Sequence, residues 1–150
     1  MILQSKWYFC FLLLWLLSCQ EEGKTDPQTA FFAANDTAIE INGRFTEGDE
    51  NMVAFGWSAT EIRTQFSGPT CRLMIESITP TFSTFSYSPS TYFRVEVDGK
   101  VQVLQLEEGE TSLLLGEDFG PGWHDLSVFK RTEAETGYNY FYGVKLATGE

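Results

Sequence analysis

The sequence predicts an all-β protein whose main domain is an antiparallel β-sandwich of the jelly-roll kind. Apolar residues alternate with polar ones over short segments, turn signals separate these segments about every eight to twelve residues, and no stretch shows a convincing helical period. The 150 residues, of which 43% are hydrophobic and 15% aromatic, are typical of a globular chain. These observations favour one sandwich or barrel over a βαβ arrangement.

The N-terminal segment is typical of a secretory leader. Lys6 precedes an unbroken apolar run over residues 7–17. As a helix this run would reach only roughly 16 Å, about half of a ~30 Å hydrocarbon core, so it is too short to span a membrane. The sequence Leu16-Leu17-Ser18-Cys19 resembles a bacterial lipobox. We therefore predict a lipoprotein signal peptide over residues 1–18 and lipid attachment at Cys19.

This leader predicts an exported protein of the bacterial cell envelope, anchored by lipid to the outer membrane or cell surface, with simple secretion as the alternative. More than one acyl chain gives a stable anchor where a single chain does not. Residues 19–36 consist largely of Glu, Gly, Lys, Thr, Asp, Pro and Gln without apolar periodicity, which predicts a flexible tether. We expect the β-sandwich domain over residues 37–150, with folding beginning near Thr37.

The first strands of the domain are predicted by alternation with period two. Three sets of residues each share one strand face: Ile62, Thr64 and Phe66; Cys71, Leu73 and Ile75; and Phe93, Val95 and Val97. The strongest hairpin signal is Asp98-Gly99 between residues 92–97 and 101–106, because Asp-Gly supplies the positive φ angles of a type I′ turn. In the second arm the apolar phase shifts between Val103 and Leu104, which predicts a β-bulge.

Three more strands are predicted after this hairpin, over residues 111–115, 123–130 and 138–146. Gly116, Gly120-Pro121-Gly122 and Gly137 separate them. Residues 79–91 depart from the pattern because Ser and Thr dominate there, so we expect a long exposed loop.

Charge and cysteine usage exclude several classes of protein. The chain has 21 acidic against 10 basic residues and a net charge of −11, so a nucleic acid partner is not expected. Cys10 lies in the leader and Cys19 is assigned to lipid, which leaves Cys71 without a disulfide partner. Because Cys71 shares a strand face with Leu73, a buried apolar role is favoured over a catalytic thiol.

No catalytic residue is predicted. His124 is the single histidine, and Asp125 lies on the opposite strand face, so it cannot orient the ring as a triad acid does. A hydrogen-bonded structural histidine is favoured. Ser58 does not fit the Gly-x-Ser-x-Gly pattern of a nucleophile.

Acidic residues cluster at two places in the chain. Glu133 and Glu135 could pair as in glycoside hydrolysis, but Gly137 follows them and favours a solvated hairpin tip. Calcium ligation by Glu47, Asp49 and Glu50 is likewise disfavoured against a solvated loop. We expect neither a metal nor a cofactor.

Aromatic side chains are the best candidates for ligand contact. Sugar rings present apolar C–H faces that can lie against Trp or Tyr, and Trp57, Tyr92 and Trp123 are the carbohydrate-binding candidates. The alternative for each of them is ordinary packing in the sandwich core.

Several motifs also occur in a characteristic order. They are Gly43-Arg44, Trp57-Ser58, Phe66-Ser67-Gly68, Tyr92-Phe93-Arg94-Val95, Val97-Asp98-Gly99, Gly122-Trp123-His124, Lys130-Arg131-Thr132-Glu133 and Tyr140-Phe141-Tyr142-Gly143. From about residue 42 to 149 this order resembles the N-terminal β-sandwich (jelly-roll) domain of carbohydrate esterase family 2, the acetyl-xylan esterase-like proteins.

The resemblance implies a role in polysaccharide deacetylation. In that family an SGNH-type hydrolase domain follows the sandwich and removes acetyl groups from plant cell-wall polysaccharides with a serine and a histidine. No residue here matches that serine or histidine, so the resemblance implies a non-catalytic domain whose catalytic partner is absent from this chain, with acetylated plant polysaccharide or another glycan as ligand. The alternatives are a stand-alone surface lipoprotein that binds glycans and an envelope interaction domain without a ligand.

Overall fold

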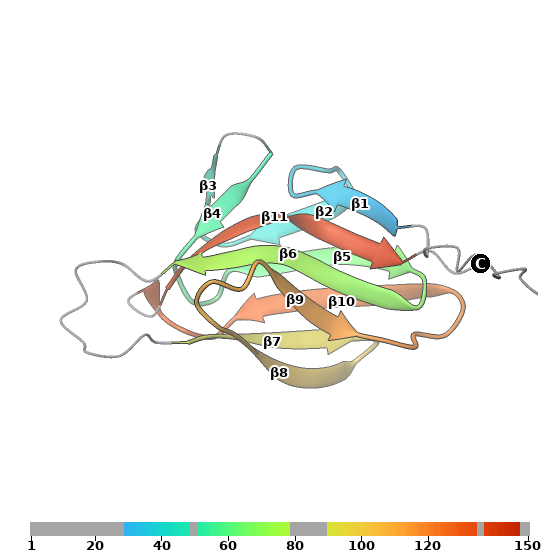
Figure 1. Cartoon of the computed structure of the whole chain (residues 1–150). Helices are drawn as coiled ribbons and strands as arrows, with labels where there is room; N and C mark the ends of the chain where they lie inside the picture. Colours follow the sequence, from blue (N-terminus) through green and yellow to red (C-terminus); the bar gives the residue numbers. More distant parts are fainter. Residues whose placement is uncertain (1–28, 49–50, 79–89, 135–136, 148–150) are drawn as a thin grey trace, which may run out of the picture.

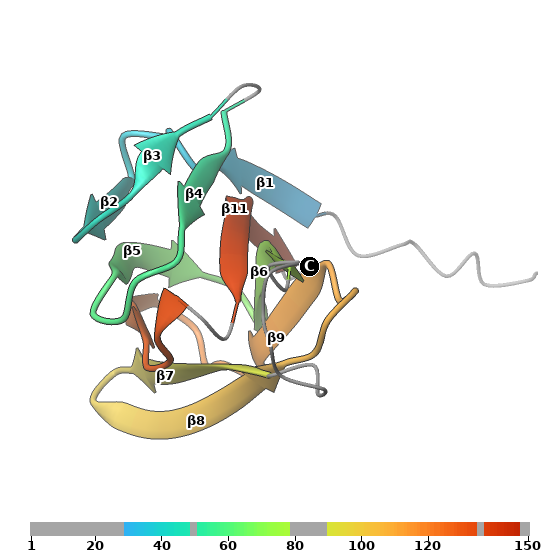
Figure 2. The ribbon, with the colours of Figure 1, turned by 90° about the vertical axis from the view of Figure 1, so that its left-hand side faces the viewer.

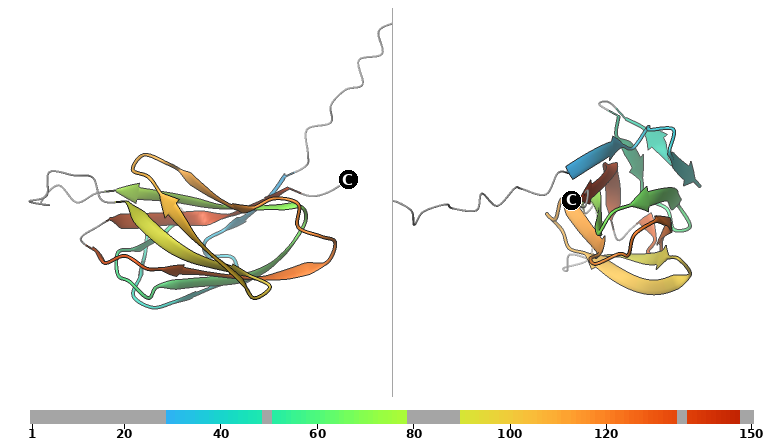
Figure 3. Two further views of the ribbon diagram at one scale, coloured as in Figure 1. Left: turned by 90° about the horizontal axis from the view of Figure 1, so that it is seen from below. Right: turned by 90° about the vertical axis from the view of Figure 1, so that its right-hand side faces the viewer.

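Two antiparallel sheets pack face to face in the computed structural model, which describes residues 29–48, 51–78, 90–134 and 137–147 (Figure 1). Sheet A has the order β3-β4-β11-β6-β9, with β1 also paired to β11, and sheet B has the order β2-β5-β10-β7-β8. The two layers are seen from one end in Figure 2, and from below and from the other end in Figure 3. The predicted all-β sandwich is confirmed.

The bounds of the strands are as follows. Sheet A contains β1 (Thr29–Ala33), β3 (Thr46–Glu47), β4 (Val53–Phe55), β6 (Thr70–Ile78), β9 (Ser112–Gly116) and β11 (Tyr138–Ala147). Sheet B contains β2 (Ile39–Asn42), β5 (Glu61–Ser67), β7 (Thr91–Val97), β8 (Lys100–Leu106) and β10 (Trp123–Lys130).

The core lies between the sheets and is built from alternate residues of each strand. Its largest buried apolar side chains are Phe55, Ile62, Phe66, Leu73, Ile75, Phe93, Leu106, Leu115 and Phe141. Cys71, Leu73 and Ile75 point inward, as do Phe93, Val95 and Val97, so these two predicted phases are confirmed. In the third predicted set Ile62 and Phe66 are buried and Thr64 is half-buried. Burial of such side chains contributes about 1.5–3 kcal/mol each, which fixes the faces that the strands turn outward.

The β7–β8 hairpin confirms the predicted turn but not the predicted bulge. Asp98 and Gly99 have φ angles of 50° and 78°, both positive as a type I′ turn requires. The register then runs without a shift from Val97↔Lys100 to Thr91↔Leu106. Apolar residues therefore occupy both faces of this edge strand: Leu106 points into the core, and Val101 and Val103 are exposed.

The folded region begins earlier than predicted, inside residues 19–36. Strand β1 pairs with β11 from Thr29↔Ala147 to Ala33↔Gly143, so the expected start near Thr37 is wrong. Main-chain pairing needs no apolar periodicity, which is why the sequence pattern missed it. Gly143 permits the contact because its φ is 147° and a side chain there would collide with the Phe32 carbonyl oxygen.

Several predictions fall on residues outside the described ranges. These are the signal peptide, Cys19, most of the 79–91 loop, Asp49, Glu50 and Glu135. Thr91, at the end of that predicted loop, is buried as the first residue of β7. Within the described ranges no helix is long and apolar enough to cross a membrane.

Candidate functional site

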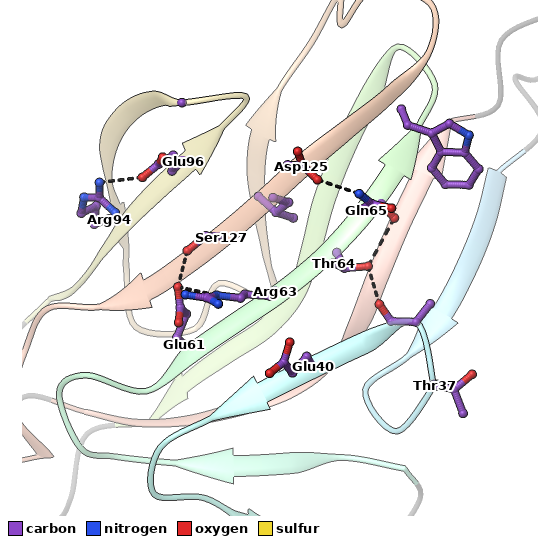
Figure 4. A pocket seen from close by; sticks show the side chains of 14 residues that line it. Thr37, Glu40, Glu61, Arg63, Thr64, Gln65, Arg94, Glu96, Asp125 and Ser127 are labelled. Atoms are coloured by element: carbon purple, nitrogen blue, oxygen red, sulfur yellow. Dashed lines mark hydrogen bonds and ion pairs between the residues drawn. The ribbon is translucent and has the colours of Figure 1, made fainter.

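A groove of about 820 Å³ lies on the outer face of sheet B, across β2, β5, β10 and β7 (Figure 4). The alternation that buries His124, Leu126 and Val128 turns Asp125 and Ser127 outward. The same rule turns polar residues of the neighbouring strands into the groove, namely Glu40, Glu61, Arg63, Gln65, Arg94 and Glu96. Core packing thus determines which side chains form this surface.

Hydrogen bonds hold the floor of the groove across β5 and β10. The Gln65 amide nitrogen donates to Asp125 Oδ1 at 2.7 Å, and these residues are cross-strand partners. The Ser127 hydroxyl donates to Glu61 Oε1 at 2.7 Å, and Arg63 Nε lies 3.0 Å from the same oxygen. These contacts fix the orientation of the side chains before any ligand arrives.

The charges in the groove are also paired. Arg94 lies 2.6 Å from Glu96 Oε2 on the outer face of β7. Burial alone would raise the pKa of the Glu61 carboxyl, but hydrogen bonds from Ser127 and Arg63 and the nearby guanidinium charges together lower this pKa below its usual value. Glu61 is therefore ionised at neutral pH. Four carboxylates against two guanidinium groups line the groove, a net charge of −2.

Of the three predicted aromatic residues, only Trp123 lines the groove. It begins β10 opposite Ser67 and is 74% exposed. Trp57, which is 50% exposed, and Tyr92, which is 39% exposed, lie near the other end of β10, roughly 23 Å away along that strand. Arg44 covers one face of Trp57, with its guanidinium carbon 5.0 Å from the ring centroid. The three side chains do not converge, and none of them packs in the core.

His124 is a buried hydrogen-bonded residue, as predicted. Its Nδ1 lies 2.7 Å from Asp98 Oδ2 and its Nε2 lies 2.9 Å from the Gly120 carbonyl oxygen, while Phe66 and Phe119 pack beside the ring. The bond to Asp98, and then the bond to Gly120, raise the pKa of His124, and the same bond lowers the pKa of Asp98. Both nitrogens face acceptors, so the protonated ring can donate to Asp98 and to Gly120 at once, and each nitrogen already has a partner.

The sequence reasoning about Asp125 is confirmed, but the partner of His124 was missed. Asp125 points outward to Gln65, away from the histidine ring. The sequence pattern marks Asp98 only as a turn residue. No local signal links Asp98 to His124, since they meet only because β7 and β10 are neighbours in sheet B.

Other candidates for catalysis are engaged or inaccessible. Burial raises the pKa of the Cys71 thiol to about 12, so it is not a thiolate at neutral pH. The Ser58 hydroxyl donates to Glu133 Oε1 at 2.9 Å. No group of three or more potential metal ligands occurs in the described part of the chain.

A buried lysine was also missed by the sequence reasoning. Lys130 has no exposed surface, and its Nζ donates to the carbonyl oxygens of Thr132 and Glu133 at 2.6 and 3.2 Å. Desolvation lowers the pKa of Lys130 to about 8, and the charge of Glu133 offsets only part of that effect. The inward phase of His124, Leu126 and Val128 includes position 130, so alternation could have identified it.

The sequence of this sandwich matches a known protein family. Residues 41–150 match the family model described as Carbohydrate esterase 2 N-terminal. The match covers most of the chain, so the chain belongs to this family, and the resemblance found in the ordered motifs is confirmed.

Solved carbohydrate esterases contain the same fold. For a family two carbohydrate esterase from Cellvibrio japonicus, the alignment covers 81% of this chain and 34% of the enzyme, at 20% identity and a TM-score of 0.68. For a family two carbohydrate esterase from Clostridium thermocellum, solved in complex with cellohexaose, the alignment covers 75% of this chain and 34% of the enzyme, at 26% identity and a TM-score of 0.60.

A third is the acetyl xylan esterase Est2A from the rumen bacterium Butyrivibrio proteoclasticus. Its alignment covers 82% of this chain and 32% of the esterase, at 14% identity and a TM-score of 0.61. The chain thus spans about a third of the length of these enzymes. No curated protein matches it.

Proposed function

We propose that this chain is the non-catalytic β-sandwich domain of an acetyl-xylan esterase-like enzyme, and that it acts in polysaccharide deacetylation beside a catalytic domain of the SGNH type. The observation that carries this proposal is the state of His124, the single histidine of the sequence. Its ring is nearly buried, and both ring nitrogens are engaged by Asp98 and Gly120.

A serine esterase needs a nucleophile, a base within hydrogen-bond reach and an oxyanion site. Neither Ser58, which is bonded to Glu133, nor the buried Cys71 has an imidazole partner among the described contacts. These observations support a role in positioning or steadying the enzyme, in which another domain supplies the ester-cleaving residues.

The test is an assay of the purified protein on an acetylated aryl ester and on acetylated xylan. We expect no turnover above a buffer blank, and the same for Ser58→Ala and His124→Ala. Turnover above the blank that disappears in either variant, at an unchanged melting temperature, would make that residue catalytic and overturn the proposal.

The alternative, a stand-alone surface lipoprotein that binds glycans, is favoured by the exposed Trp123 beside a polar groove. The coding sequence after Glu150 discriminates between the two. An in-frame or frameshifted Gly-Asp-Ser segment there would support the esterase, and its absence would support the stand-alone protein.

We also propose that the protein is exported and anchored by lipid at Cys19, because the lipobox-like tetrad follows an apolar run too short to span a membrane. Cys19→Ser should move the protein from the membrane fraction to the soluble fraction and remove the lipid mass. Unchanged fractionation and mass would contradict the anchor.

A further inference from the structure

We infer that the groove on sheet B binds a neutral, extended polysaccharide chain, with the Trp123 indole as a stacking platform at one end and the Arg94–Glu96 pair at the other. The polysaccharide class rests on the proposed function. The location and the charge preference rest on the groove itself.

The dimensions of the groove suit an oligosaccharide rather than a single sugar. Trp123, Asp125 and Ser127 point outward along β10, and the first and last of these are roughly 13 Å apart. Ser127 lies between Arg63 on β5 and Glu96 on β7, its cross-strand partners. A volume of about 820 Å³ over this length holds more than one sugar ring.

The polar lining matches the chemistry of sugar hydroxyls, which both donate and accept hydrogen bonds. Gln65 and Ser127 can do the same, while guanidinium and carboxylate groups offer two parallel donors or acceptors to neighbouring hydroxyls. Existing bonds among Gln65, Asp125, Ser127 and Glu61 hold these groups in place. Figure 4 shows these labelled side chains gathered on one face of the sheet. Such preorganisation lowers the entropic cost of binding.

Trp123 provides the apolar surface that a sugar ring needs. It is the most exposed of the large hydrophobic side chains in the described residues, and it lies at the open end of the polar floor. Trp57 differs because the Arg44 guanidinium already covers one of its faces. Trp57 is therefore a matched control, the same residue type at the opposite end of the sheet.

The charge of the groove sets the preference for neutral chains. The groove has a net charge of −2 and belongs to a chain whose total net charge is −11, so uronic acid groups meet repulsion both in contact and at a distance. Glu40, the lining carboxylate on β2, accepts a hydrogen bond from Asn42 Nδ2 at 3.0 Å rather than from Gln65 or Ser127. It is therefore a suitable position to test this preference without breaking the bonds of the floor.

The experiment is isothermal titration of the purified protein with cellohexaose, xylohexaose and mannohexaose, and with hexagalacturonate as the acidic probe. We expect at least one neutral hexasaccharide to bind and hexagalacturonate to bind at least tenfold more weakly. Trp123→Ala should lower the affinity about tenfold or more, as truncation of a binding tryptophan does, and Gln65→Ala should lower it severalfold. Trp57→Ala should leave it unchanged, and Glu40→Gln should strengthen only the binding of hexagalacturonate.

The inference is overturned if no neutral hexasaccharide binds, if Trp123→Ala and Gln65→Ala proteins with unchanged melting temperatures bind as tightly as the original, or if hexagalacturonate binds best. Loss of binding in Trp57→Ala instead would locate the site at the other end of the sheet. The esterase assay is independent of these results. An inactive protein that binds no glycan would sink this inference and leave the proposed non-catalytic role intact.

Discussion

The two ends of strand β10 hold a basic side chain in opposite ways. His124 and Lys130 share the inward phase of the strand, and both lie between the sheets. His124 meets the Asp98 carboxylate, and its pKa is raised. Lys130 meets main-chain carbonyls and the Thr132 hydroxyl, and desolvation lowers its pKa to about 8. The comparison teaches that the hydrogen-bonding partner, rather than the inward phase, determines whether the pKa of a buried basic side chain is raised or lowered.

The largest expected effect comes from removing the lysine. Lys130→Ala should lower the free energy of unfolding by about 3 kcal/mol, because it leaves a cavity and two carbonyls without their donor. Lys130→Met keeps the volume and should cost less, about 1–2 kcal/mol. Urea denaturation measures both.

Lys145→Ala is the control, because Lys145 is exposed on β11 and should change stability by less than about 0.5 kcal/mol. A loss at Lys130 no larger than that of the control would mean that the buried amine does not stabilise the turn at residues 131–134.

The second prediction uses pH to separate the contributions that His124 and Lys130, at the two ends of β10, make to stability. The contribution of His124 is fully present below its unfolded pKa, about 6.5, and is lost as pH rises through its raised folded pKa. Asp98 contributes above its ordinary pKa, and that contribution is lost as pH falls through its lowered folded pKa. This pair therefore stabilises the fold most between the ordinary pKa of Asp98 and the unfolded pKa of His124. Asp98→Asn should make the free energy of unfolding depend less on pH, and it should keep the turn.

Lys130 gives the opposite slope. Between its folded pKa of about 8 and its unfolded pKa near 10.5, the unfolded chain binds more protons, so this residue makes stability rise with pH. The measurement is the stability difference between the original protein and each variant from pH 5 to 10. Asp98→Asn should change the slope only at the lower pH values and Lys130→Met only at the upper ones. Slopes of the same sign for the two variants would contradict the comparison.

Local pattern was enough to predict the core faces and the hairpin turn. Period two identified Leu73 and Val95 as inward residues, and Asp98-Gly99 identified a type I′ turn. Both features depend on neighbours in sequence, so a single chain reveals them. Strand β1 was missed because main-chain pairing with β11 leaves no mark in side-chain periodicity.

The candidate site was less predictable for a topological reason. Each outward residue could be found from alternation, but their convergence depends on the order β2-β5-β10-β7-β8, which joins strands far apart in sequence. The same order brings Asp98 to His124 and separates Trp123 from Trp57. Residue type alone grouped three aromatics that the fold distributes over two ends of one sheet.

The smallest predicted effect concerns the two tryptophans at these ends. Arg44 lies over the ring of Trp57, and an exposed cation–π contact contributes about 0.5–1 kcal/mol. A double-mutant cycle with Arg44→Ala and Trp57→Ala should therefore give a coupling energy of that size in the free energy of unfolding. The same cycle with Trp123→Ala should give a coupling near zero, because Trp123 and Arg44 lie too far apart to interact. A coupling near zero in both cycles would mean that Arg44 does not hold the Trp57 ring, and Trp57 would then differ less from Trp123 than its use as the control for glycan stacking requires.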